Sequence, residues 1–310
     1  GFEVLNYMNN NNWIEDIPVI LISSEDSNQY IRRAYEMGVS DYISRPFDAK
    51  VVYQRVLNTI KLYAKQRRLI NLITEQVYEK EKNNKMMIDI LSQIVEFRNN
   101  ESGMHVRNIS TLTGMLLEKI VQKTDKYYLS WSERFYITNG SALHDIGKIG
   151  IPKEILNKPG KLTKEEYEII KEHTVIGEKM LKNLELYQDE PLIKTACEIV
   201  RWHHERYDGN GYPDGLKGDE IPISAQIVSI ADVYDELVSE RVYKEAFSHE
   251  KAMEMILNGE CGAFNPLLLE CLVEIQDRIK NELDGSGSVK KETYKKTIQG
   301  IERDMNINTL

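Results

Sequence analysis

Histidines and carboxylates recur through the middle of this 310-residue sequence in a pattern that could bind metal ions. Five of the six histidines belong to the set, which comprises Glu101, His105, His144, Asp145, His173, His203, His204 and Asp232. Imidazole and carboxylate groups suit divalent metals of intermediate hardness. Their wide spacing differs from the tight Cys-x-x-Cys spacing of a zinc finger and is typical of a site built from several helices. The pattern therefore predicts a multinuclear metal site inside a helical bundle.

The adjacent pair His144-Asp145 is the centre of this predicted site. Asp145 has two oxygens that can bridge two cations while His144 binds one of them. Lys148 follows one helical turn later, on the same face. A single His-Asp pair is more often a surface or helix-capping pair, so the prediction depends on the other ligands. Asp232 supports it, because apolar residues surround it in SIADVYDEL and a buried carboxylate is costly unless it is paired or bound to metal.

Three longer segments identify a family. They are HDIGKIGIPKEIL, HHERYDGNGYPDGLKGDEIP and ADVYDEL, and the second contains Gly211-Tyr212-Pro213. In this order they resemble the HD-GYP phosphohydrolases, over residues 90–280. The resemblance implies metal-assisted hydrolysis of cyclic di-GMP to linear pGpG, to GMP or to both, with two or three divalent ions, iron or manganese.

The resemblance also implies roles for individual residues. The core metal ligands would be His144, Asp145, His173, His203, His204 and Asp232, and the additional ligands of trinuclear members would be Glu101 and His105. Asp145 and Lys148 would be catalytic. A third metal ion depends on Glu101, which many dinuclear members lack.

Four residues are expected to contact the substrate, namely Lys148, Tyr212, Arg241 and Lys244. Arg241 and Lys244 would supply local positive charge in an acidic protein, although a solvated helix end is an alternative for both. Tyr212 would stack on a guanine or bind phosphate, or would serve only as a turn residue. Glu205 is expected to orient a metal-bound imidazole. Two positions depart from the family: Asn108, where Arg is usual, and Asn265, where Asp is common.

The elements that must position these residues are mainly α-helical. We expect an all-helical HD-type bundle over 86–283, preceded by a partial α/β receiver domain over 1–63 and a linker helix over 64–85, and followed by a flexible or helical tail over 284–310. Within the bundle, amphipathic stretches predict helices over 104–122, 132–147, 163–183, 190–206, 222–239, 249–258 and 266–282.

Residues 1–63 resemble the C-terminal half of a response-regulator receiver domain in the segments PVILISS, RRAYEMGVSDYI and RPF. Ser23 and Tyr42 match the hydroxyl and the aromatic residue that respond to phosphorylation, and Arg45 replaces the family's Lys. The half with the phosphoacceptor Asp would precede Gly1, so we expect no ordinary phosphorylation of this segment. A complete receiver would have a sensor histidine kinase as its partner. A plain α/β extension is the alternative.

The segment from Val51 to Phe97 has neither Pro nor Gly, which predicts one long helix or two abutting helices. A heptad pattern runs through Ile70, Ile73, Val77, Lys80, Asn84, Met87, Leu91 and Ile94. Polar residues in its middle would weaken a coiled coil but fix its register. The pattern therefore suits a parallel homodimer through 64–97, and a plain amphipathic linker is equally compatible with it.

Composition excludes several classes of protein. The net charge of −9 and the lack of a Lys/Arg stripe argue against DNA binding. No apolar run is long enough to cross a membrane, no signal peptide is visible, and three scattered cysteines form no disulfide framework. We therefore expect a cytoplasmic protein. Two alternatives to the main reading stay open: a silent adaptor that docks on a diguanylate cyclase, and an enzyme for another cyclic dinucleotide.

Overall fold

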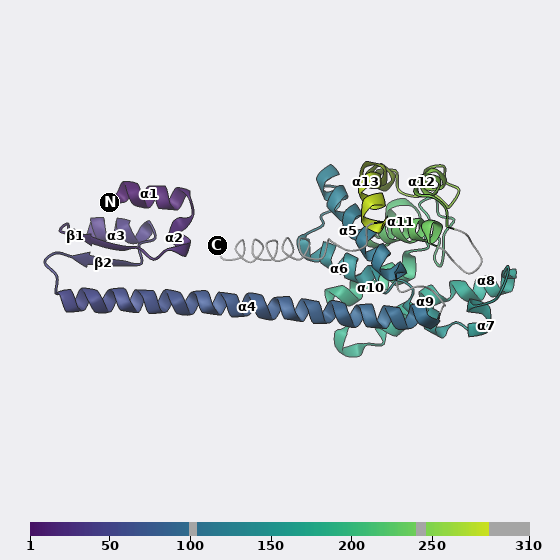
Figure 1. The fold of residues 1–310 in the computed structure, drawn as a ribbon, viewed down its shortest axis with the longest axis horizontal. Helices are drawn as coiled ribbons and strands as arrows, with labels where there is room; N and C mark the ends of the chain where they lie inside the picture. The colour runs from purple at the N-terminus through teal and green to yellow at the C-terminus, as the bar shows by residue number, and fades with distance from the viewer. Residues whose placement is uncertain (99–103, 240–245, 285–310) are drawn as a thin grey trace. The chain divides into compact units, whose positions relative to one another are not determined.

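The computed structural model describes residues 1–98, 104–239 and 246–284 (Figure 1). The chain forms two compact units, residues 1–80 and 81–310. A single helix, α4 (Ala49–Arg98), runs across the boundary between them, so the alternative of two abutting helices is wrong. The oxygen Oδ1 of Asp48 accepts hydrogen bonds from the backbone N–H groups of Lys50 and Val51, at 2.7 and 3.2 Å, and so caps the start of this helix.

The first unit is an α/β arrangement around two parallel strands. Its elements are α1 (Phe2–Asn10), α2 (Trp13–Asp16), β1 (Ile20–Ser23), α3 (Asn28–Glu36), β2 (Asp41–Ser44) and the beginning of α4. Ile20 pairs with Asp41 at one end of the two-strand ladder, and Ser23 with Ser44 at the other. Leu5, Ala34, Val39 and Tyr42 form its small apolar core.

The second unit is helical throughout its described part. Its elements are the end of α4, α5 (His105–Lys123), α6 (Trp131–Ser141), the 3₁₀ helix η1 (Ile146–Gly150), α7 (Lys153–Leu156), α8 (Lys164–Lys171), α9 (His173–Lys182), η2 (Glu185–Tyr187), α10 (Pro191–Trp202), η3 (Gly218–Glu220), α11 (Ile223–Val238), α12 (His249–Leu257) and α13 (Pro266–Asp284). The expected fold class, mainly helical with a small α/β segment at the start, is confirmed.

Helix α11 is the central element of the bundle. Almost all of its residues are buried, including the carboxylates of Asp232 and Asp235. It packs against α5, α10 and α12, while α10 packs against α6 and α9, and α5 contacts both α6 and α13 (Figure 1). A helix that is apolar on all sides is stable only inside a core. The two buried acids of α11 therefore mark a functional position.

Three predicted helices end or break earlier than expected. The predicted helix 132–147 ends at Ser141, and the chain then turns into η1. The predicted helix 163–183 is divided at Glu172 into α8 and α9, and the predicted helix 190–206 ends at Trp202. Buried residues continue past Ser141 and Trp202, so the apolar pattern does not reveal where the backbone leaves the helix at these two points.

None of the helices in the described ranges combines the length and the apolar character that a membrane span requires.

Candidate metal centre

Of the seven predicted ligands that the structure describes, six lie at the ends of helices or in the turns that follow them. His105 and His173 are the first residues of α5 and α9, His144 and Asp145 lie between α6 and η1, His203 and His204 follow α10, and only Asp232 lies inside a helix, α11. All are buried or nearly so. The structure thus brings together seven of the eight predicted ligands, and Glu101 lies outside the described residues.

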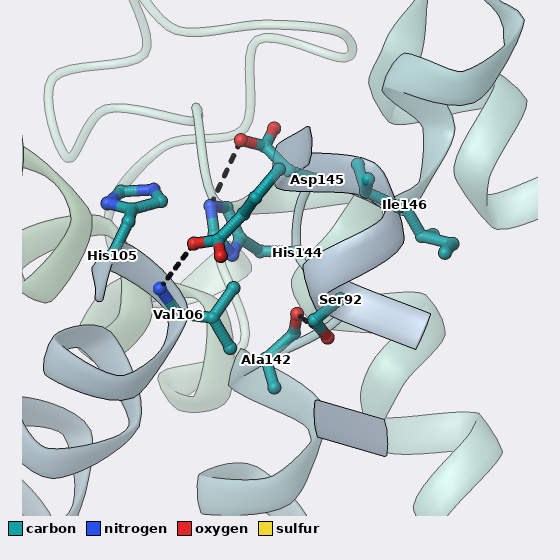
Figure 2. A pocket seen from close by; sticks show the side chains of 9 residues that line it. Ser92, His105, Val106, Ala142, His144, Asp145 and Ile146 are labelled. Atoms are coloured by element: carbon teal, nitrogen blue, oxygen red, sulfur yellow. Dashed lines mark hydrogen bonds and ion pairs between the residues drawn. The ribbon is translucent and has the colours of Figure 1, made fainter. Parts of the chain in front are cut away.

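The ligand atoms form two groups that share Asp145. One atom each from Asp145, His173, His203 and His204 lies within 4.8 Å of the others, and the same holds for His105, His144 and Asp145. The second group borders the small pocket in Figure 2. Each group is compact enough to hold a metal ion, and a carboxylate common to both has an oxygen for each.

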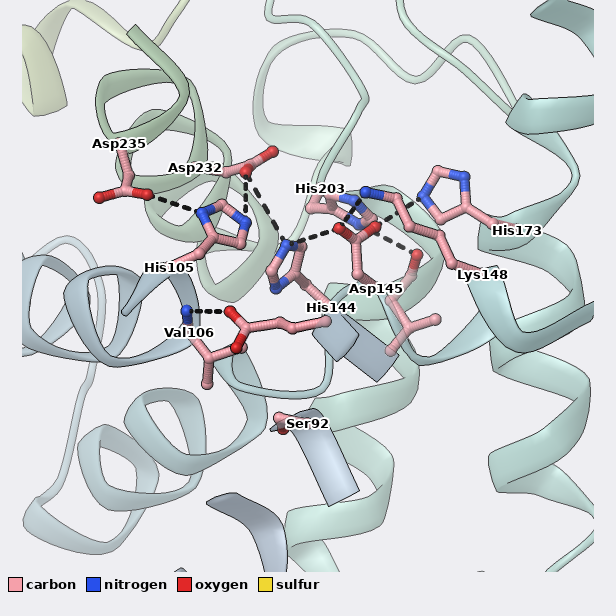
Figure 3. Close-up of polar contacts among 12 residues, drawn as sticks. Ser92, His105, Val106, His144, Asp145, Lys148, His173, His203, Asp232 and Asp235 are labelled. Atoms are coloured by element: carbon pink, nitrogen blue, oxygen red, sulfur yellow. Dashed lines mark hydrogen bonds and ion pairs between the residues drawn. The ribbon is translucent and has the colours of Figure 1, made fainter. Parts of the chain in front are cut away.

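Asp232 completes the second group from the opposite side (Figure 3). Its Oδ1 lies 3.6 Å from Nε2 of His105 and 3.8 Å from Nε2 of His144. Burial and the nearby Glu236 raise the pKa of Asp232 to about 6. A buried carboxylate of this kind is stabilised by positive charge placed beside it.

Backbone carbonyls fix the orientation of three imidazoles. Nδ1 of His144 lies 2.9 Å from the carbonyl oxygen of Ser141, Nδ1 of His173 lies 2.7 Å from that of Ile170, and Nδ1 of His203 lies 3.0 Å from that of Ile199. A carbonyl only accepts, so each Nδ1 carries a hydrogen, and in the neutral ring Nε2 then presents a lone pair. These three buried Nε2 atoms have no hydrogen-bond partner among the described residues. Buried polar atoms are nearly always satisfied, so these donor atoms fit a metal site.

The electrostatics suit coordination at most of the ligands. His144 differs, because burial opposes its charged form but the carboxylates of Asp145 and Asp232 beside it raise its pKa to about 9. Burial lowers the pKa of His173, and burial together with the neighbouring imidazoles holds the pKa values of His203 and His204 well below the usual range. Burial opposes the ionisation of Asp145, yet Lys148 and His144 hold the pKa of its carboxyl well below normal. Neutral imidazoles and an ionised carboxylate are the forms that bind metals.

Lys148 lies directly beside the shared carboxylate. Its Nζ is 2.5 Å from Oδ2 of Asp145, and both side chains are largely buried. Lys148 belongs to η1 and Asp145 directly precedes that helix, so one short segment holds both residues for which the family resemblance implies catalytic roles. The close approach of this segment to α9 requires a glycine, since a Cβ at Gly147 would lie 1.9 Å from the carbonyl oxygen of His173.

Asp235 is a site residue that the sequence reasoning missed. Its Oδ2 lies 2.7 Å from Nδ1 of His105 (Figure 3), and its Oδ1 accepts a hydrogen bond from Nδ2 of Asn108 at 2.7 Å. A carboxylate on the far nitrogen orients a ligating imidazole and increases its basicity. The available signal was the spacing of three from Asp232, which places both acids on one face of α11. Asn108, noted as a departure from the family, is therefore part of this network.

The prediction that Glu205 orients a metal-bound imidazole is wrong. Its carboxylate accepts hydrogen bonds from the backbone N–H groups of Asp214 and Gly215, at 2.7 and 3.0 Å, and of Leu216, at 3.1 Å, rather than from an imidazole. Glu205 thus holds the loop that contains the Gly-Tyr-Pro motif. A glycine is required at 211, because a Cβ there would lie 2.3 Å from the backbone nitrogen of Arg206.

Tyr212 lies beside the metal ligands at the edge of the site. Its ring centroid is 4.8 Å from that of His204, with the planes tilted by 30°. Nζ of Lys171 is 5.4 Å from the same ring, which brings to this edge a cation that the sequence reasoning had not selected. Burial raises the pKa of the Tyr212 hydroxyl, which therefore stays protonated.

Two predicted substrate contacts and one departure from the family are the remaining residues that the sequence singled out. Arg241 and Lys244 lie outside the described residues. Asn265, the second departure from the family, donates hydrogen bonds to Oε1 of Gln226 at 2.8 Å and to the hydroxyl of Tyr127 at 3.1 Å, so its role is to connect helices.

Comparisons with known proteins agree with this geometry. The HD domain family matches residues 85–262. A protein of Vibrio cholerae named "Probable cyclic di-GMP phosphodiesterase" is 36% identical over 291 residues, which cover 90% of this chain and 66% of that protein. A Thermotoga maritima protein named "Cyclic di-GMP phosphodiesterase" is 32% identical over 295 residues, which cover 90% of this chain and 76% of that protein. A "3'3'-cGAMP-specific phosphodiesterase 2" of Vibrio cholerae is 38% identical over 193 residues, which cover 62% of this chain and 35% of that protein.

Proposed function

Because the chain belongs to the HD-domain family, we propose that it is a metal-dependent phosphodiesterase that hydrolyses cyclic di-GMP to linear pGpG, to GMP or to both. The observation that carries this proposal is the pair of ligand groups that share Asp145. Such an arrangement matches two-metal phosphodiester hydrolysis, in which two adjacent cations stabilise both the attacking and the leaving oxygen.

The metal ions would be held by the predicted ligands, with Asp145 between them. When bound, divalent ions lower the pKa of water toward neutrality and offset charge on the phosphoryl oxygens. We propose iron or manganese, since a set of imidazoles and carboxylates without thiolates suits these metals. A third ion would depend on Glu101. An equal metal count in Glu101→Ala and wild-type protein would contradict the three-ion form.

Lys148 and Tyr212 are the described residues that we assign to the substrate. Lys148 is close enough to Asp145 to contact a phosphate oxygen beside the ions or to protonate the departing sugar oxygen. Tyr212 and Lys171 would bind a guanine or a phosphate at the outer edge of the site. Arg241 and Lys244 would add the positive charge that an anionic dinucleotide needs.

We further propose that a receiver controls the enzyme and that the chain forms a homodimer through 64–97. The heptad positions support the dimer, because Ile70, Ile73, Met87, Leu91 and Ile94 are between 44% and 60% exposed on the single chain. A parallel coiled coil would bury them. A complete receiver would accept phosphate from a sensor histidine kinase, and a diguanylate cyclase would be a partner in the same signalling system.

A second substrate has specific support. The relative named as specific for 3'3'-cGAMP is 38% identical over 193 residues, and the relative named as a probable cyclic di-GMP phosphodiesterase is 36% identical over 291 residues. The two dinucleotides differ in one base, so a single pocket at the base determines which is preferred.

The test is hydrolysis by purified protein loaded with Mn²⁺ or Fe²⁺. We expect cyclic di-GMP to be converted to pGpG or GMP, and 3'3'-cGAMP to be the most informative competing substrate. Asp145→Asn should abolish turnover, whereas Asp189→Asn, at a fully exposed carboxylate, should leave it unchanged. A lack of turnover of both dinucleotides by fully loaded protein would contradict the proposal and favour an adaptor that docks on a diguanylate cyclase.

A further inference from the structure

The last turns of α4 bury polar side chains against the metal centre. Ser92 and Glu96 are 2% and 3% exposed, although they lie on a helix whose earlier turns are largely solvent-exposed. Both border the small pocket whose other walls include His105, His144 and Asp145 (Figure 2). A carboxylate is rarely buried without a specific partner. The function proposed above gives these two residues no role.

Glu96 caps the helix that begins with a metal ligand. Its Oε1 accepts a hydrogen bond of 2.8 Å from the backbone N–H of Val106, the second residue of α5. The N-cap residue of α5, Met104, offers no side-chain hydrogen bond to the helix. The first N–H groups of a helix need partners, and a negative charge there also interacts favourably with the helix dipole. Glu96 therefore supplies from α4 the cap that fixes the position of His105.

Ser92, one turn earlier on α4, contacts the segment that leads to His144. Its Oγ lies 2.7 Å from the carbonyl oxygen of Ala142, two residues before His144. Around it, Ile88 and Val95 of α4 pack in one apolar cluster with Val106, Ala142 and Ile146. Consecutive turns of one helix thus contact both segments that provide the second ligand group.

We propose that Glu96 and Ser92 are positioning residues that set the distance between His105 and the His144-Asp145 pair, and so the affinity of the ion held by this group. The inference rests on the proposed metal-dependent function. The other group has three histidines, one at the start of α9 and two that follow α10, and it shares only Asp145 with this group. A shift of α4 by one residue, about 1.5 Å, would break both hydrogen bonds. Movement of α4 would therefore change the occupancy of this ion more than that of the other.

The experiment measures metal binding rather than activity alone. Mn²⁺ isotherms by equilibrium dialysis, circular dichroism and turnover of cyclic di-GMP are recorded for the full chain and for Glu96→Ala, Glu96→Gln and Ser92→Ala. Glu75→Ala is the control, since it removes the same charge from an exposed position of the same helix.

We expect Glu96→Ala to lower the affinity for one Mn²⁺ ion per chain by about 10- to 100-fold, which is the usual effect of losing a partner that orients a ligand. Ser92→Ala should lower the affinity for the same ion by a smaller factor. Glu96→Gln should stay within a few-fold of wild type, because its amide oxygen can still accept from Val106. Turnover should fall in kcat with KM nearly unchanged.

Three results would overturn the inference: isotherms identical to wild type, equal weakening of both ions, or Glu96→Gln as defective as Glu96→Ala. A fourth result would also overturn it: Glu96→Ala loses helical circular dichroism while Ser92→Ala binds metal as wild type does. Glu96 would then stabilise the fold rather than position a metal ligand. If wild-type protein binds metal but does not hydrolyse cyclic di-GMP, only the proposed function fails, and the isotherms still test the positioning role.

Discussion

The orientation of each imidazole is the feature on which the site depends at the scale of single residues. His144, His173 and His203 are held by carbonyl oxygens three or four residues earlier in the chain, so local backbone geometry is enough to orient them. His105 is held instead by Asp235, a carboxylate from a helix far away in the sequence. A charged acceptor binds an imidazole N–H more strongly than a neutral carbonyl does. The position of His105 is therefore sensitive to changes outside its own helix.

Removal of this carboxylate should weaken metal binding. We expect Asp235→Ala to reduce the affinity of the ion at His105 by about 10- to 100-fold, because the ring loses its orientation and part of its basicity. Competition against a chelator of known affinity measures the effect. Asp277→Ala, at an exposed acid of α13, is the matched control. Unaltered metal affinity in Asp235→Ala would show that His105 does not ligate or needs no partner.

A second prediction concerns Gly147. Alanine there would place its Cβ 1.9 Å from the carbonyl oxygen of His173, so the HDIGK segment and α9 would have to separate. We expect Gly147→Ala to lower the free energy of unfolding by about 1–3 kcal/mol, as overpacking usually does. Urea titration of metal-free protein measures it. Gly114→Ala is the control, since its Cβ would meet nothing within 4 Å inside α5 and should be neutral or stabilising.

At the scale of elements, the apolar pattern predicted helices better than it predicted their ends. The predicted helix 222–239 is observed as α11, Ile223–Val238, because its continuous apolar surface requires burial on all sides. The predicted helix 132–147 stops at Ser141 because the chain must turn to bring Asp145 toward α9. Tertiary contact decides such a turn, and hydrophobic periodicity carries no signal for it.

The same distinction applies to the site. The HD-GYP family and the class of enzyme were predicted from contiguous motifs, and the HD-domain match and the phosphodiesterase relatives confirm both. Asp235 and Glu96 were not predicted, because the partner of Asp235 is a ring far away in the sequence and the partner of Glu96 is a backbone N–H, which no side-chain pattern reveals. Glu205 was assigned to an imidazole, since hydrogen bonds to the backbone of a loop leave no side-chain pattern in the sequence.

The loop that contains Tyr212 depends on this tether. We expect Glu205→Ala to leave the N–H groups of residues 214–216 without their acceptor and to loosen the loop. KM for cyclic di-GMP should rise, and hydrogen exchange at 214–216 should become faster, whereas metal affinity should change little. Glu185→Ala, at an exposed acid of η2, is the control. Unchanged exchange at 214–216 would contradict the tether.

At the scale of the whole molecule, the exposed apolar side chains of α4 predict self-association. Ile73→Glu combined with Leu91→Glu would place charges in the seam of a parallel coiled coil, so we expect sedimentation velocity to show a dimer for wild type and a monomer for this variant. Leu69→Glu with Ile90→Glu is the matched control. These residues are 57% and 50% exposed but lie beside the seam, at positions that tolerate charge, and this variant should remain dimeric. Monomeric wild-type protein at micromolar concentration, or equal dissociation of both variants, would contradict a coiled coil in this register.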